Sequence, residues 1–502
     1  SAANSNNATT VNLTTASASS VSFSNNDSTF NALTANGGSS TSFGSGLTIA
    51  TDTGKLALDS TSITSAGALT LTGATGIDFG AGVMTFTAGG DLTMSTASGD
   101  LTGAGAFTLA SVGNISLSEN LTTAGATVIT ADSDGNGAGD FSINSSKTLS
   151  TGNNSLALTA NDITVSGSIS SGTGSTTIAV SDGGTVGLGG TSGNMSISGA
   201  ELANITAGTL NIGNSATGNI TVDSISAANS NNVTTLNLTT ASASSVNFSS
   251  NASTFHALGV SSGNGITQNV SITTSGVATL DADSNDDGSG DYSNTAGAFS
   301  TGGRTLSITA NDFGLSGAIN TGTGATTLLV SDGGSIGLGS TSGNMTITGS
   351  ELGNITAGTL TIGDSTAGAM TVNGISSANS TNITTVDLNS SSIAFSTGDS
   401  TFNGLTATAN TGTITGAVAL TVTGTSSFTT SASNQSITLS STSNDFTSAV
   451  SFNTTGSLAN TTLVTNSAII LDAPTIGGDY SVTVGGTSKT MNISGAQDVG
   501  GT

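Results

Sequence analysis

The chain contains no cysteine and a single proline, Pro474, among its 502 residues. Without cysteine it can form no disulfide, use no thiol in catalysis and bind no metal through thiolate ligands. One proline excludes a collagen triple helix, because that structure needs proline together with a strict Gly-X-Y period. No apolar run approaches the roughly 20 residues that span a bilayer as a helix. The sequence therefore predicts no transmembrane segment.

Basic residues are almost as scarce, with 4 Lys and Arg against 29 Asp and Glu and a formal net charge of −25. Nucleic-acid binding depends on Lys and Arg that displace counterions, so the composition excludes that class of partner. Anionic membrane surfaces are disfavoured for the same reason, whereas cations are natural partners. So few basic residues also leave few sites for trypsin-like proteases, which suits a protein exposed outside the cell.

Large side chains are few as well, since aromatic residues make up 4% and charged residues 7% of the chain. Disorder is one interpretation of such low complexity. Disordered chains, however, combine low hydrophobicity with high charge, whereas this chain has a mean hydropathy of +0.16. We expect instead a thin core built from single apolar side chains on short strands.

The chain repeats itself on a long scale. SAANSNN begins at Ser1 and again at Ser226, and a related SSANSTN begins at Ser376. The first interval exceeds the second by the length of about three coils of the shorter repeat described next, and a solenoid tolerates the insertion of whole coils. We expect one continuous β-solenoid over residues 1–502, with repeat modules 1–225, 226–375 and 376–502.

A shorter repeat runs inside these modules. GALTL at Gly67, GDLTM at Gly90 and GNISL at Gly113 follow one another at 23-residue intervals. Alternation of apolar residues with Thr is typical of half-buried strands, and the Gly, Asn, Ser and Asp between them suit tight turns. The pattern predicts an all-β fold, a parallel β-helix with coils of about 23 residues.

Long matched segments carry a resemblance to a known family. LTANDITVSGSISSGTGSTTIAVSDGG, from Leu158, is answered by ITANDFGLSGAINTGTGATTLLVSDGG, from Ile308. In this repeat style the chain resembles bacterial β-strand-repeat surface proteins related to filamentous-haemagglutinin-type adhesins, over nearly its whole length. The resemblance implies a right-handed parallel β-helix, secretion, and a role in adhesion or surface structure.

Two Asp-rich loops share the pattern D-x-[DN]-x-[DN]-G-x-G-D. Alternating oxygen side chains on a tight glycine-containing loop suit a hard cation such as Ca²⁺. Neither is an EF-hand loop, because the position of its bidentate Glu is Ile143 or Asn294. The alternative is a solvated, Asx-rich turn. The candidate metal ligands are Asp132, Asp134, Asn136, Asp140, Asp283, Asn285, Asp287 and Asp291.

Other acidic residues recur in matched positions. They could act as paired carboxylates of a glycosidase, but we favour turn residues that accept hydrogen bonds from backbone amides. The pairs are Asp162 and Asp312, Asp182 and Asp332, and Glu201 and Glu351.

The single histidine, His256, aligns with Asn31 and Asn403, so its position does not require an imidazole. One histidine cannot support a credible nucleophile relay. We therefore expect no enzymatic activity.

Rows of Thr, Ser and Asn on stacked strands predict flat, polar outer faces. Sheet edges are normally protected, and neither end of the sequence shows such protection, which indicates a longer polypeptide or subunits that stack. We expect an extracellular structural protein that self-associates as a homo-oligomeric filament, sheath or stalk. The alternative is an adhesin rod that binds glycans or other cells, and a remote alternative is an enzyme acting on polysaccharide.

Overall fold

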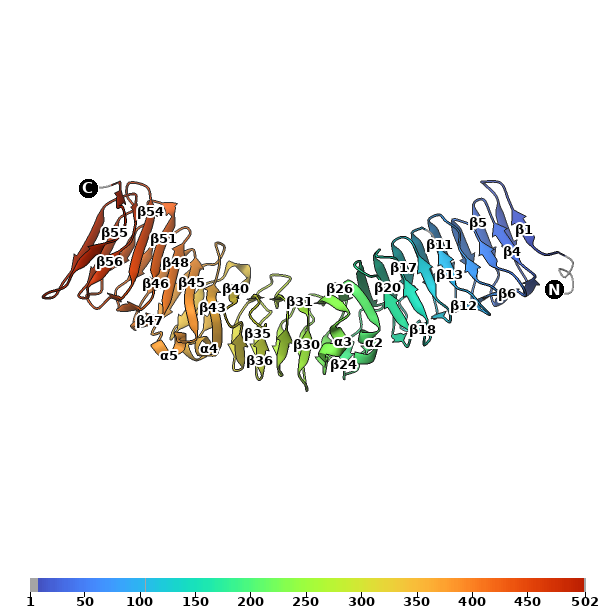
Figure 1. The fold of residues 1–502 in the computed structure, drawn as a ribbon, viewed down its shortest axis with the longest axis horizontal. Helices are drawn as coiled ribbons and strands as arrows, with labels where there is room; N and C mark the ends of the chain where they lie inside the picture. The colour runs from blue at the N-terminus through green and yellow to red at the C-terminus, as the bar shows by residue number, and fades with distance from the viewer. Residues whose placement is uncertain (1–7, 104, 501–502) are drawn as a thin grey trace. The chain divides into compact units, whose positions relative to one another are not determined.

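The computed structural model describes residues 8–103 and 105–500. The chain is almost entirely β and forms a parallel β-solenoid of about 22 turns, as the sequence predicts. It divides into two compact units, of which the first is drawn from blue to green and the second from green to red in Figure 1. Unit 1 runs to Val246 and includes Ser253–His256, and unit 2 comprises Asn247–Ala252 and the residues from Ala257 onwards. The module boundaries at 226 and 376 stay predictions.

Unit 1 has three faces of parallel strands. The first face contains β1 (Val11–Thr14), β4 (Leu33–Asn36), β7 (Leu56–Leu58), β10 (Ile77–Asp78), β13 (Leu101–Gly103), β16 (Leu121–Thr123), β19 (Thr148–Ser150), β22 (Ser168–Ser170) and β26 (Ile205–Gly213). The second contains β2 (Ser20–Phe23), β5 (Ser40–Phe43), β8 (Ser62–Ser65), β11 (Met84–Ala88), β14 (Phe107–Ser111), β17 (Thr127–Thr130), β20 (Leu156–Ala160), β23 (Ser175–Val180) and β28 (Val233–Thr239), with β26 bridging both. The third contains β3 (Ser28–Phe30), β6 (Leu47–Thr51), β9 (Leu69–Gly73), β12 (Leu92–Thr96), β15 (Ile115–Leu117), β18 (Phe141–Ile143) and β21 (Ile163–Val165).

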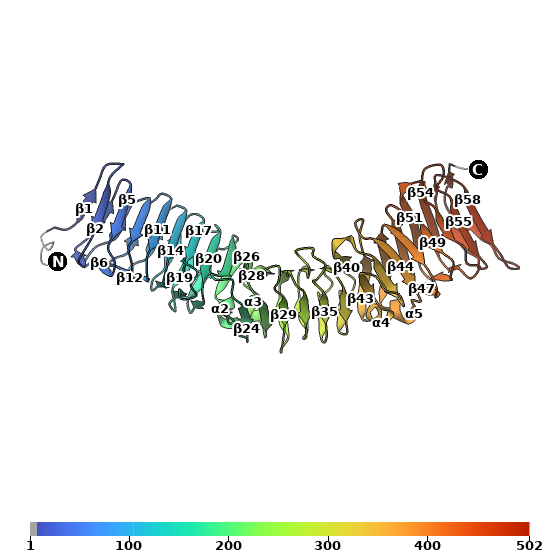
Figure 2. The same ribbon diagram turned by 180° about the vertical axis from the view of Figure 1, so that it is seen from behind.

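The last coils of unit 1 add short elements at one corner. They are β24 (Val186–Gly189), β25 (Met195–Ile197), α2 (Gly199–Ala203), β27 (Ile220–Asp223), α3 (Ala227–Ser230) and β30 (Ser253–Phe255), and β29 (Val246–Phe248) follows β28 in the chain. Figure 2 shows α2 and α3 beside β24. Within the described residues, no helix is long and apolar enough to cross a membrane.

Unit 2 repeats the design. One face contains β31 (Ala257–Ser261), β34 (Ala278–Asp281), β37 (Leu306–Ala310), β40 (Ala325–Val330), β43 (Ile355–Ile362), β45 (Ile383–Ser390), β48 (Gly404–Ala409), β51 (Ser426–Ser433), β54 (Ala449–Thr455), β56 (Ile469–Leu471), β57 (Thr475–Ile476), β59 (Met491–Ile493) and β60 (Asp498–Val499). Shorter ladders are formed by β32 (Ile266–Gln268), β35 (Tyr292–Asn294) and β38 (Phe313–Leu315), by β33 (Ile272–Thr274), β36 (Ala298–Ser300) and β39 (Ala318–Asn320), and by β47 (Ser400–Phe402), β50 (Leu420–Val422) and β53 (Asp445–Phe446).

A further ladder of unit 2 starts beside two short helices. It contains β42 (Met345–Ile347), β41 (Ile336–Gly339), β44 (Ala369–Asn373), β46 (Ser392–Phe395), β49 (Ile414–Gly416), β52 (Ile437–Leu439), β55 (Thr461–Thr465) and β58 (Tyr480–Val484). The helices are α4 (Gly349–Gly353) and α5 (Ser377–Ser380), and a 3-10 turn, η1, spans Ser331–Gly333.

Register explains how the core is built. Leu69, Leu92 and Ile115 pair in series on the third face, one coil apart, and all three are buried. The alternating side chains point outward and are mostly Thr or Ser. Each coil therefore covers the apolar residues of its neighbour and cannot be stable alone. Other coils are shorter, as between β13 and β16, or longer, as where β23 pairs with β26.

The longest coils contain a connection that the sequence analysis did not predict. β24 and β25 pair in parallel, with Val186 opposite Met195, although only residues 190–194 separate them. Parallel neighbours normally need a dozen or more residues between them. Here the return loop packs closely against β24. A Cβ atom on Gly187 would lie only 2.5 Å from the backbone carbon of Ser192, so glycine is what permits this approach. β41 and β42 in unit 2 are joined in the same way.

Candidate functional site

The two Asp-rich loops occupy matched corners, between β17 and β18 and between β34 and β35. The first residue of each loop is buried, Asp132 at 1% and Asp283 at 0% exposure. The Asp132 carboxylate accepts hydrogen bonds from the backbone amides of Asn136 at 2.9 Å and Gly137 at 3.0 Å. Asp283 accepts the equivalent bonds in unit 2. Each loop is thus organised around its own first carboxylate.

A hydroxyl from a later coil completes this arrangement. Ser181 Oγ donates to Asp132 Oδ2 at 2.5 Å, and Ser331 Oγ donates to Asp283 Oδ2 at 2.6 Å. Burial by itself raises the pKa of Asp132, but the bonds from Ser181 and from the two backbone amides outweigh it and hold that pKa below its ordinary value. The ionised carboxylate therefore ties the loop to a coil further along the chain.

The third and fifth loop positions exchange their residue types between the units. Unit 1 has Asp134 and Asn136, and unit 2 has Asn285 and Asp287. Asn136 Nδ2 donates to Asp134 Oδ2 at 2.8 Å, and Asn285 Nδ2 donates to Asp287 Oδ2 at 2.7 Å. Each loop thus keeps one amide donor and one carboxylate acceptor, which is enough to close it by a hydrogen bond between the two side chains.

The last loop residue bonds to the following coil. Asp140 Oδ1 accepts from Asn161 Nδ2 at 3.0 Å and from the backbone amide of Asp162 at 3.1 Å. Asp291 makes the same two bonds in unit 2. This carboxylate therefore links the end of the loop to the following coil.

These contacts bear on the predicted Ca²⁺ sites. In residues 8–103 and 105–500, no group of three or more His, Cys, Asp or Glu side chains is placed to hold a metal ion. Negative charge is nevertheless concentrated around the loop of unit 2, where burial and the neighbouring Asp283, Asp286 and Asp287 raise the pKa of Asp332. The oxygen ligands of these loops suit a hard cation. The same side chains, however, already form hydrogen bonds that close each loop without a metal ion. Ca²⁺ at the eight candidate ligands stays a prediction.

The matched glutamates, Glu201 and Glu351, accept backbone hydrogen bonds where no further strand continues the ladder. Beyond β21 the ladder of the third face is interrupted, and Glu201 Oε1 accepts the backbone amide of Val165 at 3.0 Å. Glu201 Oε2 accepts the amide and the hydroxyl of Ser198 at 2.9 and 2.8 Å, so the same side chain closes the capping box of α2. Glu351 repeats this clamp on Leu315 and Thr348.

The matched aspartates complete the interrupted ladder. Asp162 Oδ1 accepts the backbone amides of Ile163 at 2.8 Å and Ser196 at 2.9 Å. Asp312 does the same in unit 2, where burial raises its pKa above the ordinary value despite these bonds, and the charges of Asp291 and Glu351 add to the rise. The structure thus places these carboxylates against backbone amides, as the turn interpretation predicts. Asp182 likewise accepts the amide of Gly184, at 2.9 Å.

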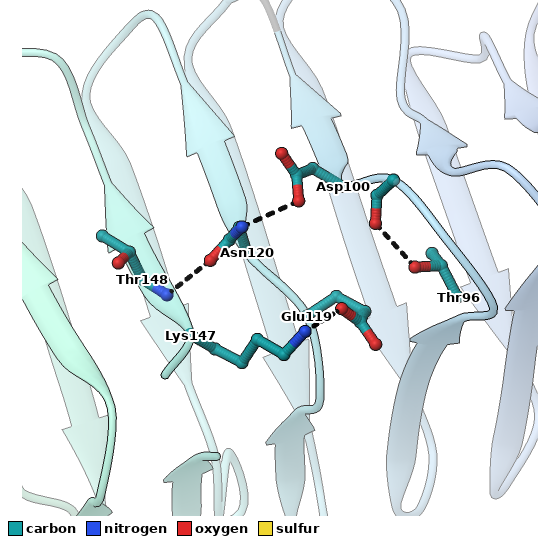
Figure 3. A network of polar contacts seen from close by, with 7 residues as sticks. Thr96, Asp100, Glu119, Asn120, Lys147 and Thr148 are labelled. Atoms are coloured by element: carbon teal, nitrogen blue, oxygen red, sulfur yellow. Dashed lines mark hydrogen bonds and ion pairs between the residues drawn. The ribbon is translucent and has the colours of Figure 1, made fainter. Parts of the chain in front are cut away.

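Asx side chains link coils at other corners too. Figure 3 shows Asn120 Nδ2 donating to Asp100 Oδ1 at 2.8 Å while Asn120 Oδ1 accepts the backbone amide of Thr148 at 2.8 Å. Beside them, Lys147 Nζ and Glu119 form a partly buried ion pair between neighbouring coils. Side chains therefore extend the backbone ladder around the corners.

His256 fits this scheme. It is exposed, and its Nδ1 lies 2.8 Å from the carbonyl oxygen of Thr234, one coil earlier. Asn31 Nδ2 and Asn403 Nδ2 donate to carbonyls one coil earlier at the aligned positions, also at 2.8 Å. The shared requirement is an N–H donor, which confirms that the position does not need an imidazole.

Neither the return loops nor the short helices α2, α3, α4 and α5 were predicted from the sequence. The capping-box pattern at Ser198 and Glu201 was a readable signal for α2, and Thr348 and Glu351 were the signal for α4. The donors to Asp132 and Asp283 had no local signal, because Ser181 and Ser331 lie two coils along the chain.

Comparison with known proteins gives one similarity. Residues 383–453, from the start of β45 into β54, match the family described as repeats of unknown function (DUF5649). No curated protein and no solved structure matches the chain. The chain is thus a β-repeat protein in which one segment of unit 2 is similar to this family.

Proposed function

We propose that the chain is an extracellular structural protein whose solenoid self-associates to build a filament, sheath or stalk at the cell surface. The observation that carries the proposal is the outer surface of the ladders, where hydroxyl side chains stand in register from coil to coil. On the third face this row contains Thr48, Thr70, Thr93, Ser116, Ser142 and Thr164.

Such rows suit packing of one copy on another. A hydroxyl both donates and accepts hydrogen bonds, and neighbours in the row already pair, as Ser142 Oγ does with Ser116 Oγ at 3.1 Å. The net charge of −25 opposes association of copies, and bound cations would reduce that repulsion. The proposal therefore includes Ca²⁺ as an aid to assembly, bound at the two Asp-rich loops.

Sedimentation velocity tests the proposal. The purified chain is measured from low to high micromolar concentration, with Ca²⁺ and with a chelator. We expect the weight-average sedimentation coefficient to rise with concentration, and to rise further with Ca²⁺. A monomer at every concentration in both solutions would contradict self-association.

An adhesin is the second candidate, in line with the resemblance to filamentous-haemagglutinin-type proteins. The supporting observation is a shallow cavity of about 430 Å³ in unit 2, inside the segment that matches the repeat family. Its lining carries no charge and combines Thr and Asn side chains with Gly backbone, which suits a neutral glycan. The lining residues are Thr384, Thr385, Asn403, Gly404, Thr423, Gly424 and Thr425. A glycan array tests it, and no signal above background would count against binding.

The proposal includes no catalytic activity. Glu201 and Glu351, two of the carboxylates considered for a glycosidase, accept hydrogen bonds from backbone amides at both oxygens. Turnover of a polysaccharide that is lost in E201Q and E351Q variants, while both variants stay folded, would contradict this part of the proposal.

A further inference from the structure

A buried amide in unit 2 has no hydrogen-bonding partner within the protein. Asn294, the last residue of β35, is 0% exposed, and neither Oδ1 nor Nδ2 of its side chain bonds to another group. An unsatisfied polar group in a protein interior lowers stability, and native proteins rarely leave such a group without a partner. The amide therefore indicates a hydrogen-bonding partner that is not a protein group.

Asn294 has a polar neighbour on one side of the ladder and the buried Leu315 on the other. Gln268, directly opposite it in the ladder, is also 0% exposed. Tyr292, two residues earlier on β35, is buried and donates its hydroxyl to Gln268 Oε1 at 2.6 Å, while Gln268 Nε2 donates to the carbonyl of Val270 at 2.9 Å. Gln268 Oε1 keeps a second lone pair for another donor.

Unit 1 has an apolar version of the same corner. Its β15 and β18 precede and follow the first Asp-rich loop as β32 and β35 precede and follow the second. Leu117, Phe141 and Ile143 stand where unit 2 has Gln268, Tyr292 and Asn294, and all three are buried. The same three core positions are therefore apolar in unit 1 and polar in unit 2. Because all three differ together, we treat Gln268, Tyr292 and Asn294 as one polar cluster.

We propose that this corner of unit 2 encloses an ordered water molecule bound to the Asn294 amide. Buried waters typically make about three hydrogen bonds to groups that the protein leaves unsatisfied. The Asn294 amide offers a donor and an acceptor, and Gln268 Oε1 offers a further acceptor. All three side chains are uncharged at neutral pH and enclosed, which favours a small neutral ligand over an ion or a larger molecule.

Oxygen-17 magnetic relaxation dispersion tests the proposal, because it counts water molecules that stay buried for long times. The wild-type chain is compared with N294I, which installs the residue of unit 1. We expect N294I to lose one long-lived water relative to the wild type. An equal count in the two proteins would overturn the proposal.

Thermal unfolding provides an independent readout in the same proteins. If Asn294 were dry, N294I would remove an unsatisfied amide and raise the Tm clearly. With water bound to the amide we expect little change or a decrease, and a clear rise would overturn the proposal. I143N is the matched control in unit 1. The neighbouring positions there are the apolar Leu117 and Phe141, so the new amide would be buried without partners and should lower the Tm. A triple Q268L/Y292F/N294I variant, which restores the apolar set, guards against a packing defect in N294I alone.

Discussion

At the scale of single residues, side-chain oxygens accept hydrogen bonds from backbone amides of neighbouring coils, as carbonyl oxygens do within the ladders. Asx residues at the corners accept amide hydrogens of the next coil, and Glu201 and Glu351 accept amide hydrogens of the preceding coil where a ladder is interrupted. A buried amide that loses its acceptor is costly. The acidic residues of this chain thus stabilise the fold through hydrogen bonds, in addition to giving the chain its negative charge.

The Glu201 clamp gives the first prediction. E201Q keeps the size of the side chain but replaces one acceptor oxygen with a donor, so it faces either Val165 or Ser198 with the wrong group. We expect the free energy of unfolding to fall by about 1–3 kcal/mol, measured by urea denaturation of the full chain. D52N, which changes an exposed carboxylate, is the matched control and should stay within about 0.5 kcal/mol of the wild type. Equal effects of the two substitutions would refute the clamp.

Asp132 gives a prediction about pH. Its pKa lies below the ordinary value in the folded chain, so its ionised form contributes stability above the unfolded-state pKa of about 3.9. That contribution is lost as the pH falls below this value and through the folded-state pKa. We expect unfolding titrations to show a shallower loss of stability below about pH 4 in D132N than in the wild type. Parallel acid profiles of the two proteins would contradict the assignment.

At the scale of elements, the return loop between β24 and β25 depends on glycine. In G187A or G193A the new Cβ would lie 2.5 Å from backbone atoms across the loop. Backbone cannot move aside cheaply, so we expect each substitution to lower the free energy of unfolding by about 2 kcal/mol or more. Urea denaturation measures this, with G82A as the control because a Cβ there meets no atom within 4 Å. A loss no larger than that of G82A would show that the loop does not press on the strand.

Strands were predictable from the sequence, and their irregular connections were not. Alternation around Leu69, Leu92 and Ile115 fixes strand type, face and register at once, because each position repeats one coil later. The return loop at Gly187 carries no such signal, since short connections between parallel strands contradict the general rule. The capping boxes of α2 and α4 were visible, but such short helices leave no apolar stripe.

The candidate site was predictable only in part. The Asp-rich pattern located both loops and their matched corners. It could not show that Asp132 is buried or that its partner is Ser181, because that contact depends on how the coils stack. The exchange of Asp and Asn between the third and fifth loop positions was likewise explained only by the structure, which shows that the Asn side chain donates a hydrogen bond to the Asp side chain in each loop.

At the scale of the whole molecule, repetition and charge act in opposite directions. Stacked coils create long hydroxyl rows that suit association, while a net charge of −25 opposes it. Bound cations would reduce this repulsion. We therefore expect self-association of the chain to depend on the ionic conditions and to be promoted by Ca²⁺.

Negative-stain electron microscopy of the purified chain, in excess Ca²⁺ and in chelator, tests the proposed Ca²⁺-aided self-association. The matched variant replaces Asp134, Asn136, Asn285 and Asp287 by serine, which removes the outer candidate ligands and keeps the buried Asp132 and Asp283 that organise the loops. We predict filaments of the wild type in Ca²⁺ that come apart in chelator, and fewer filaments of the variant. Single particles of one chain in both solutions would contradict self-association.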